Sequence, residues 1–94
     1  MIRAVFGRDR VTVMGHAGYA PKGQDIVCAA ASALVFALIG SLRQEENLRE
    51  VVIRPGYVTA AKGPCREELE LVRCGLAQLA AQYPQCVEVE GNCR

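Results

Sequence analysis

Residues 25–43 read DIVCAAASALVFALIGSLR, and the predicted fold is built around them. It opens on an aspartate, whose side-chain oxygen can cap the first turn of a helix, and it holds no helix breaker before Gly40. No charged residue lies between Ile26 and Leu42, and a helix that is hydrophobic on all sides is usually buried. The sequence therefore predicts a central helix over residues 26–43, capped by Asp25 and packed on more than one side.

A membrane span is the competing interpretation of this stretch. Its 17 residues from Ile26 to Leu42 lie at the lower limit of the spanning range of about 17–25 residues, and they include Gly40. Neither a cleavable signal nor a transit peptide precedes them, because Met1–Val5 already has the character of a strand. We expect a buried helix and no membrane contact.

Two pairs of short hydrophobic runs flank the helix. Ile2–Phe6 and Val11–Met14 are joined by the polar residues 7–10, and Leu48–Arg54 and Tyr57–Lys62 are joined by Pro55-Gly56. Glycine, proline and aspartate between β-forming runs are typical of hairpin turns. The sequence predicts one hairpin on each side of the central helix.

Side chains alternate along a strand, and this predicts two faces for the second run. Val11, Val13 and Gly15 should point to one side of the sheet. Thr12, Met14 and His16 should point to the other side.

The last third of the chain predicts a second helix and a final strand. After Gly63-Pro64, a helix is expected over residues 66–83, with Pro84 as its stop and a strand at Cys86–Glu90. Its apolar stripe consists of Leu69, Val72, Leu76, Leu79 and Tyr83. The order ββαββα, with a further strand at the end, predicts an α+β fold: a single compact domain over residues 1–94, with a mainly antiparallel sheet and two helices packed against it.

Composition excludes several classes of function. The net charge is +1 and no basic stripe is present, so we expect no nucleic-acid binding. Five cysteines without a signal peptide argue against a disulfide framework and favour the reducing cytoplasm. With one histidine and no C-x-x-C pair, we expect no metal site and no cofactor, and Cys65, Cys74, Cys86 and Cys93 are interpreted as small packing or incidental thiols.

His16 and Cys28 form the candidate catalytic pair. His16 ends a strand, and Cys28 occupies the third position of the predicted helix, where free backbone N–H groups and the helix dipole favour a thiolate. An imidazole beside such a thiol would make it a nucleophile. The N–H groups around Cys28 and Ala29, expected to be unpaired, are candidate donors for an oxyanion hole.

Other residues near this pair could also contribute to the site. Asp25 is foremost a helix cap, and its carboxylate could also orient His16. Ser32 lies one turn after Cys28 and could bond its own backbone or contact the site. Residues 18–24, which include Gly18, Tyr19, Lys22 and Gly23, form a glycine-bearing loop that could close over a substrate.

These residues resemble the signature of a known family. Gly15-His16-Ala17, then Gly23, residues 25–30 and Ser32-Ala33 closely resemble the pattern of Prp, the ribosomal-processing cysteine proteases of bacteria. The resemblance covers nearly the whole chain, because the element order and length also match. Ala31, where the pattern often has a larger β-branched residue, and Pro21 and Lys22 in the loop depart from it and put specificity in doubt more than chemistry.

The resemblance implies a function for each matched position. Cys28 would be the nucleophile, His16 its general base and Asp25 a supporting residue, with residues 18–24 as a mobile loop over the site. The substrate would be the N-terminal extension of a large-subunit ribosomal protein, cut after a bulky aromatic residue, and the protein would be a homodimer.

Two other functions stay open at this stage. The chain could be a non-catalytic, ribosome-associated binding module in which Cys28 only packs. It could also be a redox-sensing thiol protein, for which Cys28 needs a resolving partner among the other cysteines.

Overall fold

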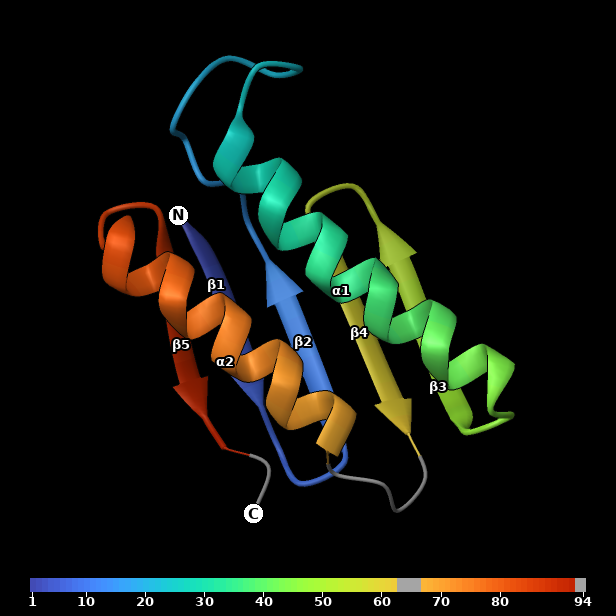
Figure 1. Cartoon of the computed structure of the whole chain (residues 1–94). Coiled ribbons are helices and arrows are strands. Elements are labelled where there is room, and N and C mark those ends of the chain that lie inside the picture. The colour runs from blue at the N-terminus through green and yellow to red at the C-terminus, as the bar shows by residue number, and fades with distance from the viewer. Residues whose placement is uncertain (63–66, 93–94) are drawn as a thin grey trace.

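The computed structural model describes residues 1–62 and 67–92, and it consists of two layers, a five-stranded sheet and two helices that cover one of its faces (Figure 1). The elements are β1 (Ile2–Phe6), β2 (Arg10–Met14), α1 (Ile26–Gln44), β3 (Leu48–Arg54), β4 (Tyr57–Lys62), α2 (Glu67–Gln82) and β5 (Val87–Gly91). The predicted order ββαββαβ and the single compact domain are confirmed. The expected start of the second helix, with Gly63-Pro64, lies outside the described residues.

The strand order in the sheet is β3-β4-β2-β1-β5. The pairs β1·β2, β2·β4 and β3·β4 are antiparallel, as predicted, whereas β5 pairs with β1 in parallel. The parallel pair follows from the connection through α2, because a helical crossover returns the chain in the same direction. This arrangement leaves β3 and β5 as the two edges and places α1 over the side of the sheet that holds β4 and β3 (Figure 1).

The core lies between the sheet and the two helices. Helix α1 contributes six buried side chains: Val27, Ala31, Val35, Leu38, Ile39 and Leu42. Helix α2 contributes Leu69, Val72 and Leu76, as its predicted stripe requires. Each larger aliphatic side chain removed from water in this way stabilises the fold by about 1.5–3 kcal/mol.

The expectation that α1 packs on more than one side is confirmed, but the helix is not buried all round. The helix packs on the sheet and against α2, but its remaining surface is exposed, with Ile26 at 59% and Phe36 at 46% of their full exposure. By length and composition alone the 19 residues of α1 could cross a membrane, but the core helix of a soluble protein passes the same test. Its six buried side chains belong to the core of this domain.

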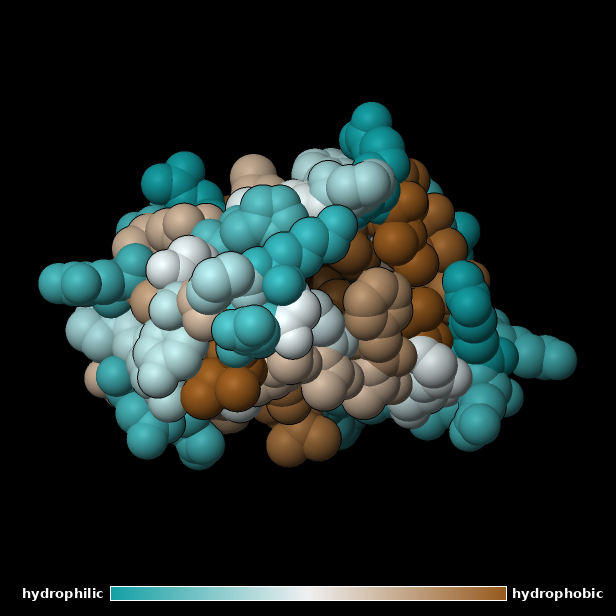
Figure 2. Space-filling view, turned by 90° about the horizontal axis from the view of Figure 1, so that it is seen from above, coloured by the Kyte–Doolittle hydropathy of each residue, from teal (hydrophilic) through white to brown (hydrophobic). Residues whose placement is uncertain are grey.

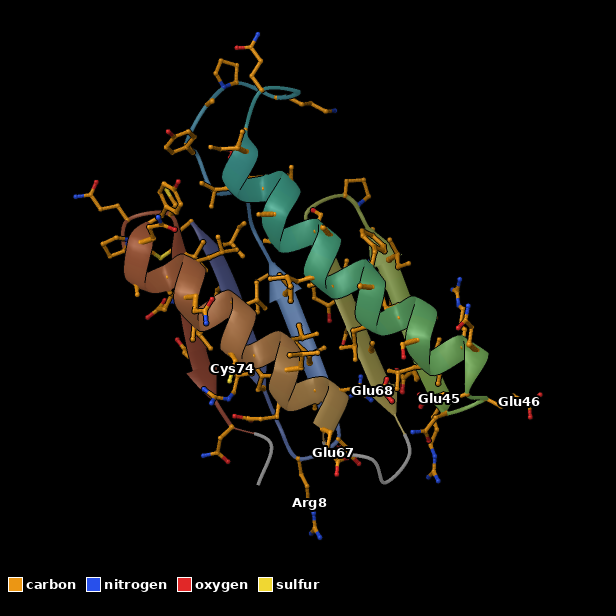
Figure 3. The ribbon with its side chains drawn as sticks, viewed as in Figure 1. Arg8, Glu45, Glu46, Glu67, Glu68 and Cys74 are labelled. Atoms are coloured by element: carbon orange, nitrogen blue, oxygen red, sulfur yellow. The ribbon has the colours of Figure 1, made fainter. Side chains whose placement is uncertain are left out.

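The end of α1 and the beginning of α2 meet at one edge of the helical layer. Figure 3 shows Glu45, the residue that follows α1, on the same side as Glu68 in the first turn of α2. A hydrogen bond with Glu68 raises the pKa of Glu45, and burial and the repulsion between the two charges add to the rise. One oxygen of Glu68, Oε2, is buried without a hydrogen-bond partner.

Candidate active site

Asp25 organises the start of α1. Its Oδ1 accepts hydrogen bonds from the backbone N–H groups of Val27 (3.0 Å) and Cys28 (2.9 Å), and its Oδ2 accepts from Tyr19 (3.0 Å) and Ala20 (3.3 Å). The bond from Cys28 is the largest cause that lowers the pKa of Asp25, and the other three bonds lower it further against the opposing effect of burial. The predicted cap is confirmed, and the same carboxylate also ties residues 19 and 20 to the helix.

The orientation of His16 differs from the prediction. His16 lines the same cleft as Val13 of β2, on the helix-covered side of the sheet, and not the side of Thr12. The reason is Gly15, whose φ of +90° ends the strand and breaks the alternation. A side chain at Gly15 would collide with the carbonyl of Met1, so glycine is required there for two reasons.

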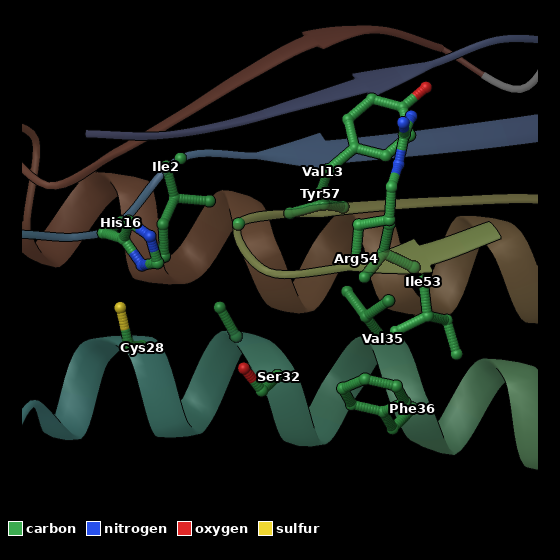
Figure 4. Close-up of a pocket in the computed structure, with 14 residues that line it drawn as sticks. Ile2, Val13, His16, Cys28, Ser32, Val35, Phe36, Ile53, Arg54 and Tyr57 are labelled. Carbon is green, nitrogen blue, oxygen red and sulfur yellow. The ribbon is translucent and has the colours of Figure 1, made fainter. Parts of the chain in front are cut away.

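Cys28 lies opposite this histidine. Figure 4 shows its sulfur directed from α1 toward the His16 ring. The backbone N–H of Ala17 donates a hydrogen bond to Sγ at 3.2 Å. The chain itself therefore directs one backbone donor at the sulfur.

Two hollows meet at His16, Cys28 and Ser32. The first, here called the apolar cleft, has a volume of about 210 Å³ and lies between α1 and the β3–β4 hairpin, where it is lined by Val13, Val35, Phe36, Ile53, Tyr57 and Val58 among others. The second, the loop-side hollow, has a volume of about 640 Å³ and is lined by Gly18, Ala20, Lys22, Gly23, Asp25, Ala29 and Pro55 together with the three shared residues. Figure 2 shows hydrophobic side chains gathered around a hollow when the molecule is viewed from the end that carries residues 18–24. A chain that crosses the site would pass from one hollow to the other over the sulfur.

The loop of residues 18–24 is docked on the body of the protein. The Tyr19 ring meets the Tyr83 ring edge to face, with 5.4 Å between the ring centroids. Together with the two bonds to Asp25, this contact holds the first half of the loop. Its closure over a substrate stays a prediction.

The expectation of unpaired N–H groups at the helix start is wrong. The N–H of Cys28 donates to Asp25 Oδ1, and that of Ala29 donates to the Asp25 carbonyl at 3.1 Å. Both N–H groups were predicted to be free, but the predicted cap residue, Asp25, accepts a hydrogen bond from each of them. Within the described part of the chain, the Asp25 carboxylate accepts from four backbone N–H groups and makes no hydrogen bond to His16.

Ser32 lies one turn after Cys28 on the same face of α1 and contributes to both hollows (Figure 4). Among the described residues, no cluster of three histidine, cysteine or acidic side chains could hold a metal ion. Cys74 and Cys86 are free, as is Cys28, while Cys65 and Cys93 lie outside the described residues.

Sequence reasoning missed the residues that long-range packing brings to the site. Phe36 and Ile53 were not singled out, although they line the apolar cleft and are 46% and 48% exposed. Pro55-Gly56 was interpreted only as a turn, yet Gly56 lies against the His16 ring. A large hydrophobic residue at an exposed helical position is the one local signal that could have indicated Phe36.

Comparisons with known proteins agree on one family. The family model "Cysteine protease Prp" matches residues 1–88. The ribosomal processing cysteine protease Prp of Mycoplasma pneumoniae is 32% identical over 94 residues, which cover 96% of this chain and 94% of that protein.

Solved structures show the same fold. The essential ribosomal processing protease Prp from S. aureus, in complex with a covalently linked product peptide, superposes with a TM-score of 0.86 at 21% identity, covering 96% of this chain and 98% of that one. SMU.848 from Streptococcus mutans gives a TM-score of 0.75 at 27% identity, covering 96% and 92% of the two chains.

Proposed function

The chain belongs to the Prp family of cysteine proteases, and from this premise we propose that it is an endopeptidase that cuts through a Cys28–His16 dyad. The single observation that carries the proposal is the meeting of His16, Cys28 and the Ala17 N–H between two hollows. A thiol at a helix start, next to an imidazole and a backbone donor, is the environment in which cysteine becomes a nucleophile.

The mechanism follows from these positions. The Cys28 thiolate attacks the carbonyl carbon of the peptide bond, a C–S bond forms, and the carbonyl oxygen takes the negative charge. When the C–N bond breaks, the His16 imidazolium gives its proton to the leaving amine. A water molecule then attacks the thioester while His16 accepts its proton, and the acid product leaves with Cys28 restored.

The developing oxyanion needs donors that are free in the transition state. The N–H groups of Cys28 and Ala29 are held by Asp25 in the free protein. The Ala17 N–H donates to the sulfur, and once the sulfur has bonded to carbon this donor can turn to the adjacent oxygen. We assign the Ala17 N–H, which lies next to the start of α1, as a donor to the oxyanion.

The substrate we propose is the N-terminal extension of a large-subunit ribosomal protein, cut after a bulky aromatic residue. The apolar cleft supports the aromatic specificity, since its volume of about 210 Å³ exceeds the roughly 150 Å³ of an apolar cavity that binds benzene. The S. aureus relative has been solved with a substrate peptide, which supports a peptide as ligand of this fold. The residues after the cut would lie in the loop-side hollow.

Homodimer formation is also part of the proposal. The exposed side of α1 supports it, because no charge occurs from Ile26 to Leu42 and the shallow groove between α1 and α2 is lined by small residues such as Ala33, Ala37 and Gly75. Sedimentation of the wild type and of Ala37→Glu is the measurement. We expect the wild type at twice the mass of the variant, and a monomeric wild type contradicts the dimer.

We place the protein in the cytoplasm. The free thiols of Cys28, Cys74 and Cys86 support a reducing compartment. The net charge of +1 gives a ribosome-binding module no electrostatic footprint.

The decisive experiment incubates the purified protein with the extended ribosomal protein and follows the product by mass spectrometry. Cys28→Ala should lower the rate by about 10⁴-fold or more, since it removes the nucleophile, and His16→Ala should also be severely impaired. Cys74→Ala, which removes an exposed thiol on α2, is the matched control and should cleave at the wild-type rate. Normal cleavage by Cys28→Ala rules out the proposed dyad.

A further inference from the structure

The turn between β3 and β4 touches the imidazole of His16. A Cβ built on Gly56 would lie 3.1 Å from His16 Nε2, 3.6 Å from Cε1 and 3.9 Å from Cδ2. We propose that Gly56 is a positioning residue that sets the distance between the His16 ring and the Cys28 sulfur. This inference rests on the proposed function, because it assigns Gly56 a role through His16.

A backbone hydrogen bond fixes the turn to the residue before the histidine. The N–H of Gly15 donates to the carbonyl of Gly56 at 2.9 Å, one step beyond the last β2–β4 pair, Met14 and Tyr57. Gly15 is in turn confined by the Met1 carbonyl. The backbone that carries His16 and Ala17 to the sulfur is thus held by the tip of a hairpin some 40 residues later in the chain.

The turn is the wall of the site opposite to α1. Gly56 lines the apolar cleft and Pro55 lines the loop-side hollow, so the turn separates the two hollows on the sheet side. Figure 4 shows the His16 ring between the Cys28 sulfur and this turn. His16 itself is exposed, and the core therefore does not hold its ring.

Only glycine fits position 56, for two reasons. Its φ is +70°, which residues with a Cβ rarely adopt, and a contact at 3.1 Å is tighter than nine in ten real Cβ contacts. A methyl group here would displace the ring by a few tenths of an ångström, because the imidazole moves more easily than the backbone. Since a misplacement of about 1 Å can cost about 100-fold in rate, we expect a loss of about tenfold.

Two variants separate the contact from backbone strain. Gly56→Ala and Gly56→Asn both carry a Cβ, but asparagine tolerates a positive φ better than alanine. We expect both to lower kcat about tenfold with KM changed less than twofold. Gly18→Ala has the same φ of +70° and no atom within 4 Å of the added Cβ, so its Tm gives the stability cost of the strain alone.

The single histidine allows a readout that needs no substrate. In the proton NMR spectrum, the Cε1–H signal of His16 should shift when Cys28→Ala is introduced, since the sulfur lies beside the ring. In the Gly56→Ala background this response should fall by at least half. An equal response in both backgrounds overturns the inference, as does full recovery of kcat in Gly56→Asn.

The two proposals fail in different ways. If His16→Ala cleaves normally, the dyad is wrong, and the NMR comparison still decides whether Gly56 positions the ring. If His16→Ala is inactive while both Gly56 variants keep the wild-type kcat, only the role of Gly56 is lost.

Discussion

The two helices of this small domain begin in different ways. Helix α2 carries Glu67, Glu68 and Glu70 in its first turn, where acidic side chains match the positive end of the dipole. Helix α1 has no acidic residue in its first turn; its N–H groups are capped from outside by Asp25, and Cys28 occupies the turn. Both helices therefore have negative charge at their N-terminal ends, but in α1 the charge comes from the residue before the helix, which leaves the first turn to Cys28.

The exposed surfaces of α1 and α2 also differ in charge. Helix α2 carries four charged residues in its first half, and Arg73 pairs with Glu70 at 2.6 Å. Helix α1 is uncharged to Leu42 and exposes Phe36 next to the apolar cleft. One helix serves mainly the core, and the other serves the core on one side and the site on the other.

The largest expected effect comes from removing the external cap of α1. Asp25→Ala leaves the N–H groups of Val27 and Cys28 without their acceptor and releases Tyr19 and Ala20. We expect cleavage to fall about 100-fold, because the sulfur and the loop both lose their alignment, and Tm to fall by about 5 °C. Steady-state kinetics and thermal unfolding are the measurements. Glu67→Gln at the start of α2 is the control and should keep the wild-type rate.

The pH dependence of Asp25 gives a second test of the same cap. Its pKa is lower in the folded protein than the ordinary value of 3.8, so it stabilises the fold above that value and the gain disappears as pH falls through the folded pKa. The Tm difference between the wild type and Asp25→Asn should be constant above about pH 5 and should narrow below 3.8. A difference that grows in acid would contradict the assigned bonds.

A smaller effect on cleavage is expected when a charge is placed on the exposed surface of one helix or the other. Phe36→Asp places a charge in the wall of the apolar cleft, and we expect KM for an aromatic-containing peptide to rise about tenfold, since a charge there opposes burial of the ring. Leu71→Asp, at a position 73% exposed on α2, is the matched control and should leave kcat and KM unchanged. Equal effects of the two substitutions would remove the cleft from the substrate path.

The smallest effect concerns the place where the two helices meet. Because Glu68 raises the pKa of Glu45, the folded state holds that proton more tightly than the unfolded chain, so this pair stabilises the fold below the ordinary value of 4.5 and the gain is lost as pH rises. Glu45→Gln should therefore raise Tm by a few degrees at pH 7.5, with no advantage near pH 4.5. Thermal unfolding from pH 4 to 8 measures this. Glu46→Gln, whose side chain points away from α2 in Figure 3, is the control, and a lower Tm of Glu45→Gln at all pH values would refute the pairing.

Local patterns predicted the elements well, since each depends on neighbours in sequence. The β-forming residues and the turn at Pro55-Gly56 placed β3 and β4 at their observed bounds, and the cap at Asp25 placed the start of α1. The side of the sheet that His16 faces was predicted wrongly, because strand alternation was extended across Gly15, whose φ of +90° breaks it. The N–H groups of Cys28 and Ala29 were predicted to be free, but the Asp25 side chain accepts from the first and the Asp25 carbonyl accepts from the second.

Sequence patterns alone predict the ββαββα order, the capped helix α1, and one histidine and one thiol near the start of that helix. They can do so because propensity, capping and turn chemistry act over a few residues. Three features follow from tertiary packing alone: β5 lies parallel to β1, α1 and the β3–β4 hairpin enclose an apolar cleft, and Gly56 contacts His16. These contacts join segments far apart in the chain, and their formation depends on how the buried faces of the sheet and helices fit together. The chemistry of the site needs both: the residue types come from local sequence, and their distances come from packing.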